Sequence, residues 1–398
     1  MTRLLVLIAL CFVTGIADLY AAPEKRAIDI VYLTRAYAEP LPLSLVEPVV
    51  TDDGIQGARL GISDNLTTGR FLGHDYKLIE SKAEDHGSLL DAARKQITNG
   101  HRFFVTDLEP EDLIAVADLP EAKDSIFLNV RSSDDALRGT DCRNNVFHVA
   151  PSFAMRADAL GQYLAWKKWR KWLVLIGDQP SNQGYAAAIQ RAATRYGAKI
   201  VDERKLHFDP GNRRSETGHQ QIQTQIPMLT QNAPEHDVVF VADNDETFGE
   251  YLMWRTAAAK PVVGTQGLVA VAWHRSFEQY GGVQLQNRFQ NFAKRIMTER
   301  DYLAWLGVRI FGEAVTRSAK SDAAGLYAFL LSPKFGIAAF KGQALSFRPW
   351  DQQLRQPILL SGPRALVSMS PQDGFLHEKS ITDTLGYDQP ETQCKLTD

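Results

Sequence analysis

Residues 153–196 read FAMRADALGQYLAWKKWRKWLVLIGDQPSNQGYAAAIQRAATRY. The unbroken apolar run WLVLIG at residues 172–177 is typical of a strand that is buried on both faces. The segments on either side of it, residues 153–169 and 184–196, are predicted to be helices. A buried strand between two helices is the repeating unit of a parallel α/β sheet.

This alternation fills most of the chain and falls into two series that break near residue 150. In the first series we expect strands at residues 28–33, 76–80, 102–106, 125–130 and 147–150. In the second series we expect strands at residues 172–177, 199–202, 237–242 and 261–264. The sequence therefore predicts an α/β fold of two doubly wound parallel-sheet lobes with an interlobe cleft. A cleft between two lobes is a natural site for a small molecule.

The N-terminus has the pattern of a secretory signal peptide over residues 1–22. A basic start ending at Arg3 is followed by the apolar run LLVLIALCFV at residues 4–13 and by small residues ending at Ala22. The run is shorter than the roughly 20 apolar residues that a membrane-spanning helix needs. We expect the mature chain to begin near Pro23 and to lie outside the cytoplasm, the alternative being a retained anchor.

The charge of the chain argues against nucleic acid or an anionic membrane as the main partner. Lys and Arg number 44, Asp and Glu number 47, and no long run of one sign occurs. The segment 166–172, WKKWRKW, interleaves aromatic and basic residues and could form a binding patch. We favour a helix end, where cations face the negative end of the helix dipole, followed by a strand.

Cysteine use agrees with an oxidising compartment. Cys11 would leave with the signal peptide, and Cys142 and Cys394 would remain as a pair. We expect a disulfide between them, because two cysteines without CxxC spacing are a weak metal or nucleophilic pair. Residues 372–398 are polar and without periodicity, so they are predicted to form a tail that this disulfide ties down.

The sequence lacks the common enzyme motifs. GxxxxGK[ST], HExxH and GxSxG are absent, no GxGxxG follows the first predicted strand, and the nine His residues are scattered. Catalytic groups can still assemble from distant positions, so a secreted α/β enzyme stays an alternative.

Several segments resemble the type I periplasmic solute-binding proteins of the branched-chain amino-acid-binding kind. Residues 53–60 (DGIQGARL) resemble the first helix of that family. Residues 129–138 (NVRSSDDALR) and 146–152 (VFHVAPS) resemble its fourth-strand loop and first interlobe crossing. Residues 272–281 and 301–305 (DYLAW) resemble the subgroup found alongside pyrroloquinoline-quinone-dependent alcohol dehydrogenase systems.

The resemblance implies three crossings between the lobes, which we place near Pro151, Trp273 and Gly336. One lobe would then comprise residues 27–150 plus 275–335, and the other residues 151–274 plus 336–371. The mechanism implied is hinge closure over a ligand, followed by presentation of the closed form to the membrane subunits of an ABC transporter. The protein would be periplasmic, and we expect a monomer.

Candidate ligand-binding residues follow from the ends of the predicted strands, where open parallel sheets bind ligands. They are Thr34, Arg35, Asp107, Arg131, Ser132, Ser133, Gln179, Tyr185, Asp243, Asp245, Glu246, Gln266 and, at a crossing, Trp273. By the resemblance, Ser132 and Ser133 would hold a carboxylate, and Asp243 or Glu246 an amine. Carboxylates at Asp107 and Glu109 depart from the family pattern, because they would repel the carboxylate of an amino acid.

Each candidate also has a purely structural interpretation. Asp107 could cap the helix predicted at residues 110–119, and Asp245 and Glu246 could cap the one at 247–259. Trp273 could be core or hinge packing. The acidic candidates could instead bind calcium or a lanthanide, the ligand set being Asp107, Glu109, Asp243, Asp245 and Glu246.

The sequence therefore predicts a periplasmic substrate-binding protein of an ABC transporter that captures a small solute, has no enzymatic activity and is linked to a quinone-dependent alcohol oxidation system. The first alternative is a protein that binds or senses a metal or cofactor for a quinoprotein dehydrogenase. No other cofactor is expected.

Overall fold

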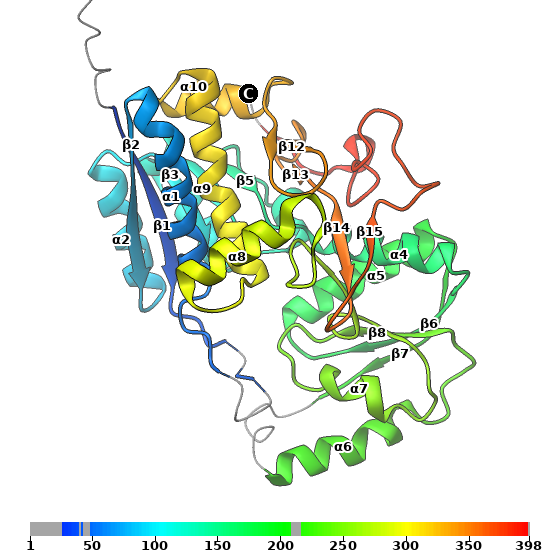
Figure 1. The fold of residues 1–398 in the computed structure, drawn as a ribbon. Helices are drawn as coiled ribbons and strands as arrows, with labels where there is room; N and C mark the ends of the chain where they lie inside the picture. The colour runs from blue at the N-terminus through cyan, green and yellow to red at the C-terminus, as the bar shows by residue number, and fades with distance from the viewer. Residues whose placement is uncertain (1–25, 40, 43–47, 208–215, 397–398) are drawn as a thin grey trace, which may run out of the picture.

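The computed structural model describes residues 26–39, 41–42, 48–207 and 216–396, and the predicted signal peptide lies outside them. Two lobes lie next to each other, one around β1–β5 and one around β6–β9 (Figure 1). In the described ranges no helix combines the length and the apolar character needed to cross a bilayer.

The first lobe is built on a five-stranded parallel sheet in the order β2-β1-β3-β4-β5. Its strands are β1 (Arg26–Arg35), β2 (His74–Ala83), β3 (Phe103–Asp107), β4 (Ile126–Asn129) and β5 (Val146–His148). All five overlap predicted strands. Four of them contain a mainly apolar run between turn residues, whereas β2, at the edge of the sheet, mixes polar and apolar residues.

Helices cover both faces of this sheet, because successive apolar side chains of β1 point to opposite faces and each face must be buried. Ile30 and Tyr32 point into a core shared with α9 (Glu299–Ser318), beside α1 (Ile55–Leu72). Val31 and Leu33 point to the opposite core, formed with α2 (His86–Thr98) and α3 (Pro110–Ala117). The helices α8 (Gly282–Ala293) and α10 (Ala323–Leu330) complete the lobe.

Asp301 fixes the beginnings of α1 and α9. Its fully buried carboxylate accepts a hydrogen bond from the Gly54 N–H at 3.0 Å and from the Thr298 N–H at 3.0 Å. Arg295 pairs with the same carboxylate at 2.5 Å. Thr298 and Asp301 together form a capping box, so α9 begins three residues before the predicted start at Tyr302.

The second lobe has a seven-stranded sheet in the order β15-β14-β10-β9-β8-β6-β7. Its strands are β6 (Lys171–Ile176), β7 (Lys199–Lys205), β8 (Val238–Ala242), β9 (Val262–Gly264), β10 (Leu268–Val271), β14 (Ile358–Ser361) and β15 (Leu366–Ser370). Strand β14 runs antiparallel to both of its neighbours, β10 and β15, so this sheet is mixed rather than wholly parallel as the alternation predicted. A short connection after β14 makes this possible, because antiparallel neighbours need no crossover helix.

Two pairs of helices cover the second sheet. Trp172 and Val174 of β6 pack with α4 (Phe153–Trp166) and α5 (Pro180–Arg195). Leu173 and Leu175 face α6 (Glu216–Thr230) and α7 (Gly249–Arg255). A strand that is apolar at every position is thereby buried on both faces, as WLVLIG predicted.

A small sheet of β11 (Ile337–Ala338), β12 (Ala344–Phe347) and β13 (Leu354–Arg355) lies beside β5. Phe347 packs edge-on against Phe147 of β5, and both belong to the core of the first lobe. This packing places residues 337–355 against the first lobe, and the chain boundaries of the two lobes, with a crossing near Gly336, stay a prediction.

The C-terminal residues are irregular but packed. Leu385 is fully buried, and Asp383 is only 3% exposed. The predicted disulfide between Cys142 and Cys394 is confirmed, with 5.6 Å between the two Cα atoms.

Replacing Gly57 by Ala should destabilise the first lobe. A Cβ on Gly57 would lie 1.8 Å from the backbone oxygen of Asp301, so α1 would have to move away from α9. We expect the free energy of unfolding to fall by about 2 kcal/mol in urea titrations. Gly87→Ala in α2 is the matched control, because its Cβ meets nothing closer than 3.6 Å. Equal stability of the two variants would contradict the close helix contact.

Candidate functional site

A cavity of about 420 Å³ lies between the two lobes. The first lobe contributes the loop after β4, the residue before the N-cap of α1 and the beginning of α9. The second lobe contributes α4, α5, β10 and the loops after β8 and β9. The cavity therefore lies at the carboxyl ends of the parallel strands, where open α/β sheets bind ligands.

Six of the predicted residues line this cavity. They are Arg131, Ser133, Tyr185, Asp243, Glu246 and Gln266. They come from both lobes, although up to 135 residues separate them in the chain. Parallel strand ends bring them together, and this is the property from which they were predicted.

Four predicted residues of the first lobe do not line the cavity. Thr34 donates from its hydroxyl to the Asp107 carbonyl at 3.1 Å, and Arg35 forms an ion pair with Asp112 at 2.9 Å. Asp107 turns inward, where it accepts a hydrogen bond from the Tyr32 hydroxyl at 2.8 Å. Ser132 is buried and accepts from the Asp134 N–H. These side chains support the cavity wall from behind.

Three predicted residues from the second series or from a crossing are also outside the cavity. Gln179 is exposed at the N-cap position of α5. Asp245 accepts a hydrogen bond from Asn182 at 2.6 Å. Trp273 is 1% exposed and stacks on Tyr302 with 4.6 Å between ring centroids, which is the core packing given above as the alternative.

The helix caps differ from those predicted. The N-cap residue of α3 is Glu109, not Asp107. Before α7, it is Asp243 that accepts the N–H groups of residues 247, 248 and 249, at 2.9, 2.9 and 2.7 Å. Asp243 lines the cavity, but these bonds occupy most of its lone pairs, so its role at the wall is largely to hold the loop after β8.

Sequence reasoning missed several lining residues. They are Asp53, Phe153, Arg156, Thr298, Glu299, Arg300, Leu303 and the residues of β10 from Val269 to Val271. Thr298 could have been found, because Thr followed three residues later by an acidic residue is a helix-start signal. Arg156 and Phe153 lie in the first turn of a predicted helix directly after the first crossing, which is a second signal that was available.

The first-lobe wall contains two arginines in a network of carboxylates. Arg131 pairs with Glu109 at 2.6 Å and with Asp107 at 3.2 Å. Glu39 bridges Arg131 at 2.8 Å and Arg300 at 2.7 Å. Burial opposes the charge of Arg131, but the surrounding carboxylates raise its pKa above the ordinary value. The arginines and carboxylates of this wall therefore neutralise one another. Such a wall favours a solute that forms hydrogen bonds with it over a solute with a large net charge.

One ion pair crosses the cavity. Arg156 of α4 pairs with Glu299 of α9 at 3.1 Å, and Arg156 also donates to the Ala270 carbonyl at 2.6 Å. Glu299 accepts in addition from the N–H of Ala272, at the second crossing. The pair thus joins the two lobes at the floor of the cleft.

The aromatic and aliphatic part of the lining lies mainly on the second lobe. The ring centroids of Phe153 and Tyr185 lie 5.5 Å apart, and residues Val269 to Val271 extend this apolar surface. Val130 and Leu303 face it from the first lobe. The cavity can therefore hold a small solute with an apolar body and polar groups at its rim.

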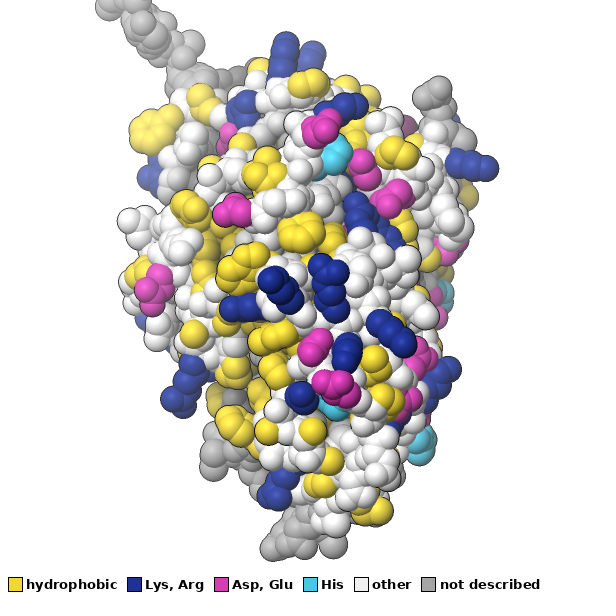
Figure 2. Space-filling model, turned by 90° about the vertical axis from the view of Figure 1, so that its right-hand side faces the viewer, with side chains coloured by type: hydrophobic (Ala, Val, Ile, Leu, Met, Phe, Trp, Pro, Cys, Tyr) yellow, Lys and Arg dark blue, Asp and Glu magenta, His cyan; other side chains and the backbone are white. Residues whose placement is uncertain are grey.

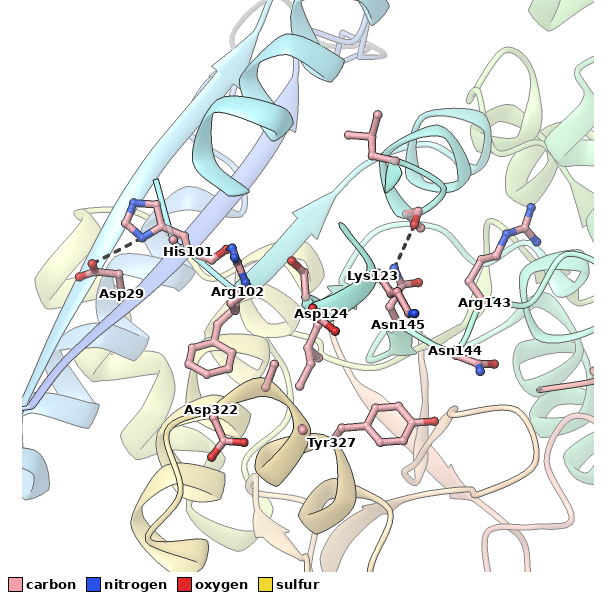
Figure 3. A pocket seen from close by; sticks show the side chains of 18 of the residues that line it. Asp29, His101, Arg102, Lys123, Asp124, Arg143, Asn144, Asn145, Asp322 and Tyr327 are labelled. Carbon is pink, nitrogen blue, oxygen red and sulfur yellow. Dashed lines mark hydrogen bonds and ion pairs between the residues drawn. The ribbon is translucent and has the colours of Figure 1, made fainter. Parts of the chain in front are cut away.

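A larger cavity of about 1150 Å³ lies at the opposite, amino ends of the first-lobe strands (Figure 3). Several of its polar side chains already pair with neighbours: His101 with Asp29 at 3.5 Å, and Asn145 with the Ala117 carbonyl at 3.0 Å. We take the smaller cavity as the candidate site, because only that one lies where parallel strands present their loops and where both lobes meet.

The predicted metal set does not assemble. Across the described ranges no three His, Cys, Asp or Glu side chains gather as ligands for an ion. Asp107, Glu109 and Asp245 are outside the cavity, each turned to another partner. The calcium or lanthanide alternative therefore has no site among these residues.

The basic and aromatic segment 166–172 lies where α4 ends and β6 begins. Trp172 is buried in the core, Trp166 is 59% exposed, and Lys171 pairs with Glu235. Figure 2 views the molecule from this side and shows Lys and Arg side chains among hydrophobic ones. The helix end and strand start agree with the interpretation favoured from the sequence.

Replacing Asp53 by Asn should change how stability depends on pH. Burial, and then the neighbouring Asp301, raise the pKa of Asp53 from 3.8 to about 6. Ionisation of Asp53 therefore destabilises the folded state relative to the unfolded one. This loss of stability is absent below pH 3.8, grows as the pH rises, and is complete above pH 6.

Urea unfolding at pH 4 and pH 7.5 measures this effect. The difference in unfolding free energy between Asp53→Asn and the native protein should shift in favour of the variant from pH 4 to pH 7.5, by up to about 3 kcal/mol. Asp75→Asn, on β2 with a side chain that is 48% exposed, is the control and should show no such gain. A parallel pH dependence of Asp53→Asn and the native protein would contradict the raised pKa.

Comparison with solved structures agrees with this geometry. A branched-chain amino acid ABC transporter periplasmic ligand-binding protein from Burkholderia xenovorans LB400 superposes with a TM-score of 0.69 at 16% identity, over 93% of this chain and 99% of that one. A leucine-, isoleucine-, valine-, threonine- and alanine-binding protein from Brucella ovis, in its closed conformation, gives 0.69 at 14% identity, over 94% and 99%.

A solute-binding protein of an ABC transporter from R. palustris, in complex with benzoate, gives a TM-score of 0.66 at 12% identity, over 93% of this chain and 100% of that one. At these identities the likeness shows the fold. No curated protein sequence matches the chain. The sequence model described as "Periplasmic binding protein" matches residues 49–361, which is most of the chain. The chain therefore belongs to the periplasmic binding protein family.

Proposed function

We propose that this protein captures a small solute in the interlobe cavity by hinge closure and performs no reaction on it. The observation that carries the proposal is the cavity itself: two lobes present the carboxyl ends of their sheets to one space, and residues of both line it. A ligand that contacts both walls binds the closed form better than the open one, and this difference drives closure.

The lining supports a solute with an apolar body and at least one hydrogen-bonding group. Phe153 and Tyr185 offer ring surface, while Ser133, Thr265 and Gln266 offer polar groups around it. Two structural neighbours are named for small ligands of this kind: one is a leucine-, isoleucine-, valine-, threonine- and alanine-binding protein, and the other is in complex with benzoate. We propose an organic acid or amino acid of similar size for this chain.

The proposed setting is the periplasm, with the chain acting as a monomer that delivers its solute to the membrane subunits of an ABC transporter. The signal-peptide pattern of residues 1–22 supports export, and the family supports delivery to a transporter. We further propose a link to quinone-dependent alcohol oxidation, which rests on the resemblance of residues 272–281 and 301–305.

Ligand identity can be tested on protein purified from its own periplasm. Native mass spectrometry would weigh a co-purifying solute, and calorimetry with leucine and benzoate would test the two named ligands directly. Binding without chemical change of the solute is expected. Turnover of a bound solute would overturn the proposal in favour of the enzyme alternative.

Ser133→Ala should weaken binding of that solute. The hydroxyl lines the cavity, and loss of one hydrogen bond costs about 1 kcal/mol, or about fivefold in Kd. Ser321→Ala is the matched control, because Ser321 lines the other cavity. Calorimetry should show weaker binding for the first variant only, and a Kd that changes equally in both would place the solute outside the cleft.

A further inference from the structure

The residues after β15 run across both lobes, and we call residues 372–396 the strap. Figure 1 shows this segment, in red, beside β12–β15 and above α4. The strap contains no helix or strand longer than the three-residue turn Gln389–Glu391. Side chains of the two lobes, rather than its own secondary structure, hold it in place.

The second lobe holds the strap through α4 and α5. The Gly386 N–H donates to the buried carboxylate of Asp158 at 2.8 Å, and Arg191 donates to the Gly386 carbonyl at 2.8 Å. Arg191 also pairs with Glu391, at 3.1 Å. Leu385 is fully buried in the second-lobe core. This part of the strap therefore moves with the second lobe.

The small sheet beside the first lobe holds the strap from the other side. Arg348 is 1% exposed and donates to the Asp383 carboxylate at 2.9 Å, and Arg355 pairs with the same carboxylate at 2.8 Å. Arg348 also donates to the Leu385 carbonyl at 2.7 Å. A charged guanidinium buried this deeply is costly to separate from its carboxylate.

The small sheet in turn is fixed to the first lobe. The amide of Gln353 donates to the carbonyls of His148 and Ala150, at 3.0 and 3.1 Å, and Arg138 donates to the Gln353 side chain at 2.8 Å. Arg348 and Arg355 are therefore attached to the first lobe, because the residue before β13 pairs with the end of β5.

A covalent bond adds a second attachment to the first lobe. Cys394 is joined to Cys142, which precedes β5. Along the strap the attachments thus go to the first lobe at Asp383, to the second at Gly386 and Glu391, and back to the first at Cys394. Only two residues lie between Asp383 and Gly386, so the Cα atoms of these two anchors can be no farther than roughly 10 Å from each other.

The geometry points to the strap as a restraint on the hinge. It limits how far the lobes separate, and the disulfide keeps its far end attached when the polar contacts loosen. Restricting the open form raises the population of conformations close to the closed one, and a solute that binds the closed form then pays a smaller conformational cost. The limit on opening is independent of the solute, whereas the effect on affinity rests on the proposed function.

Small-angle scattering of the full chain without added solute tests the restraint. We compare the native protein with Asp383→Asn and with the double variant Cys142→Ser and Cys394→Ser. Both should show a larger radius of gyration, and amide exchange across residues 382–391 should be about tenfold faster. Glu235→Gln is the matched control, because it removes an exposed ion pair with Lys171 on the second lobe, away from the strap.

Reduction and alkylation of the native disulfide is a second measurement that needs no refolding, with the mass gain confirming the modification. Circular dichroism verifies that each form stays folded. Scattering and exchange that are the same in the native, substituted and alkylated forms would overturn the restraint.

Benzoate and leucine are then titrated into the same samples. Faster dissociation of either one, about threefold or more, from the strap variants but not from Glu235→Gln supports the effect on affinity. If the strap variants show a larger radius of gyration but neither probe binds, the result counts against the proposed solutes and not against the restraint. A bound probe with unchanged scattering counts against the strap alone.

Discussion

The first-lobe wall of the cleft depends on one buried carboxylate. Asp301 receives hydrogen bonds from the beginning of α1, from the cap of α9 and from Arg295. Both helices therefore begin at the edge of the sheet where the strands end, and Asp53, Thr298 and Arg300 reach the cavity from these beginnings. This anchor adds to the core packing of α1 and α9 and fixes where both helices begin relative to the strand ends.

The parallel core of the fold could be predicted from the sequence, because buried strands of parallel sheets are apolar at every position. A run such as WLVLIG carries that signal without reference to any neighbour. The elements that were missed lack it. β10 is only partly buried, and α8 buries just Leu285 and Phe289 among its apolar side chains, so each depends on its partner rather than on its own pattern.

The candidate site divides in the same way. Residues that follow a strand directly, such as Arg131 and Gln266, could be placed at the cleft from topology alone. Residues on helix beginnings, such as Phe153 and Thr298, carry only a helix-start signal, and their position at the cleft depends on how α4 and α9 pack. Topology also cannot tell how a strand-end carboxylate is oriented: Asp107 turns to the Tyr32 hydroxyl and pairs with two arginines that line the cavity, and it does not line the cavity itself.

The position of the two cysteines in the chain has a consequence for the order of assembly. Cys142 belongs to the first lobe, and Cys394 follows it by 252 residues, after every strand and helix of both lobes. A chain delivered from its N-terminus exposes Cys142 as a lone thiol until all of the second lobe has emerged. The covalent link can therefore form only after the elements of both lobes have been delivered, so it cannot constrain the first lobe while the second is still emerging.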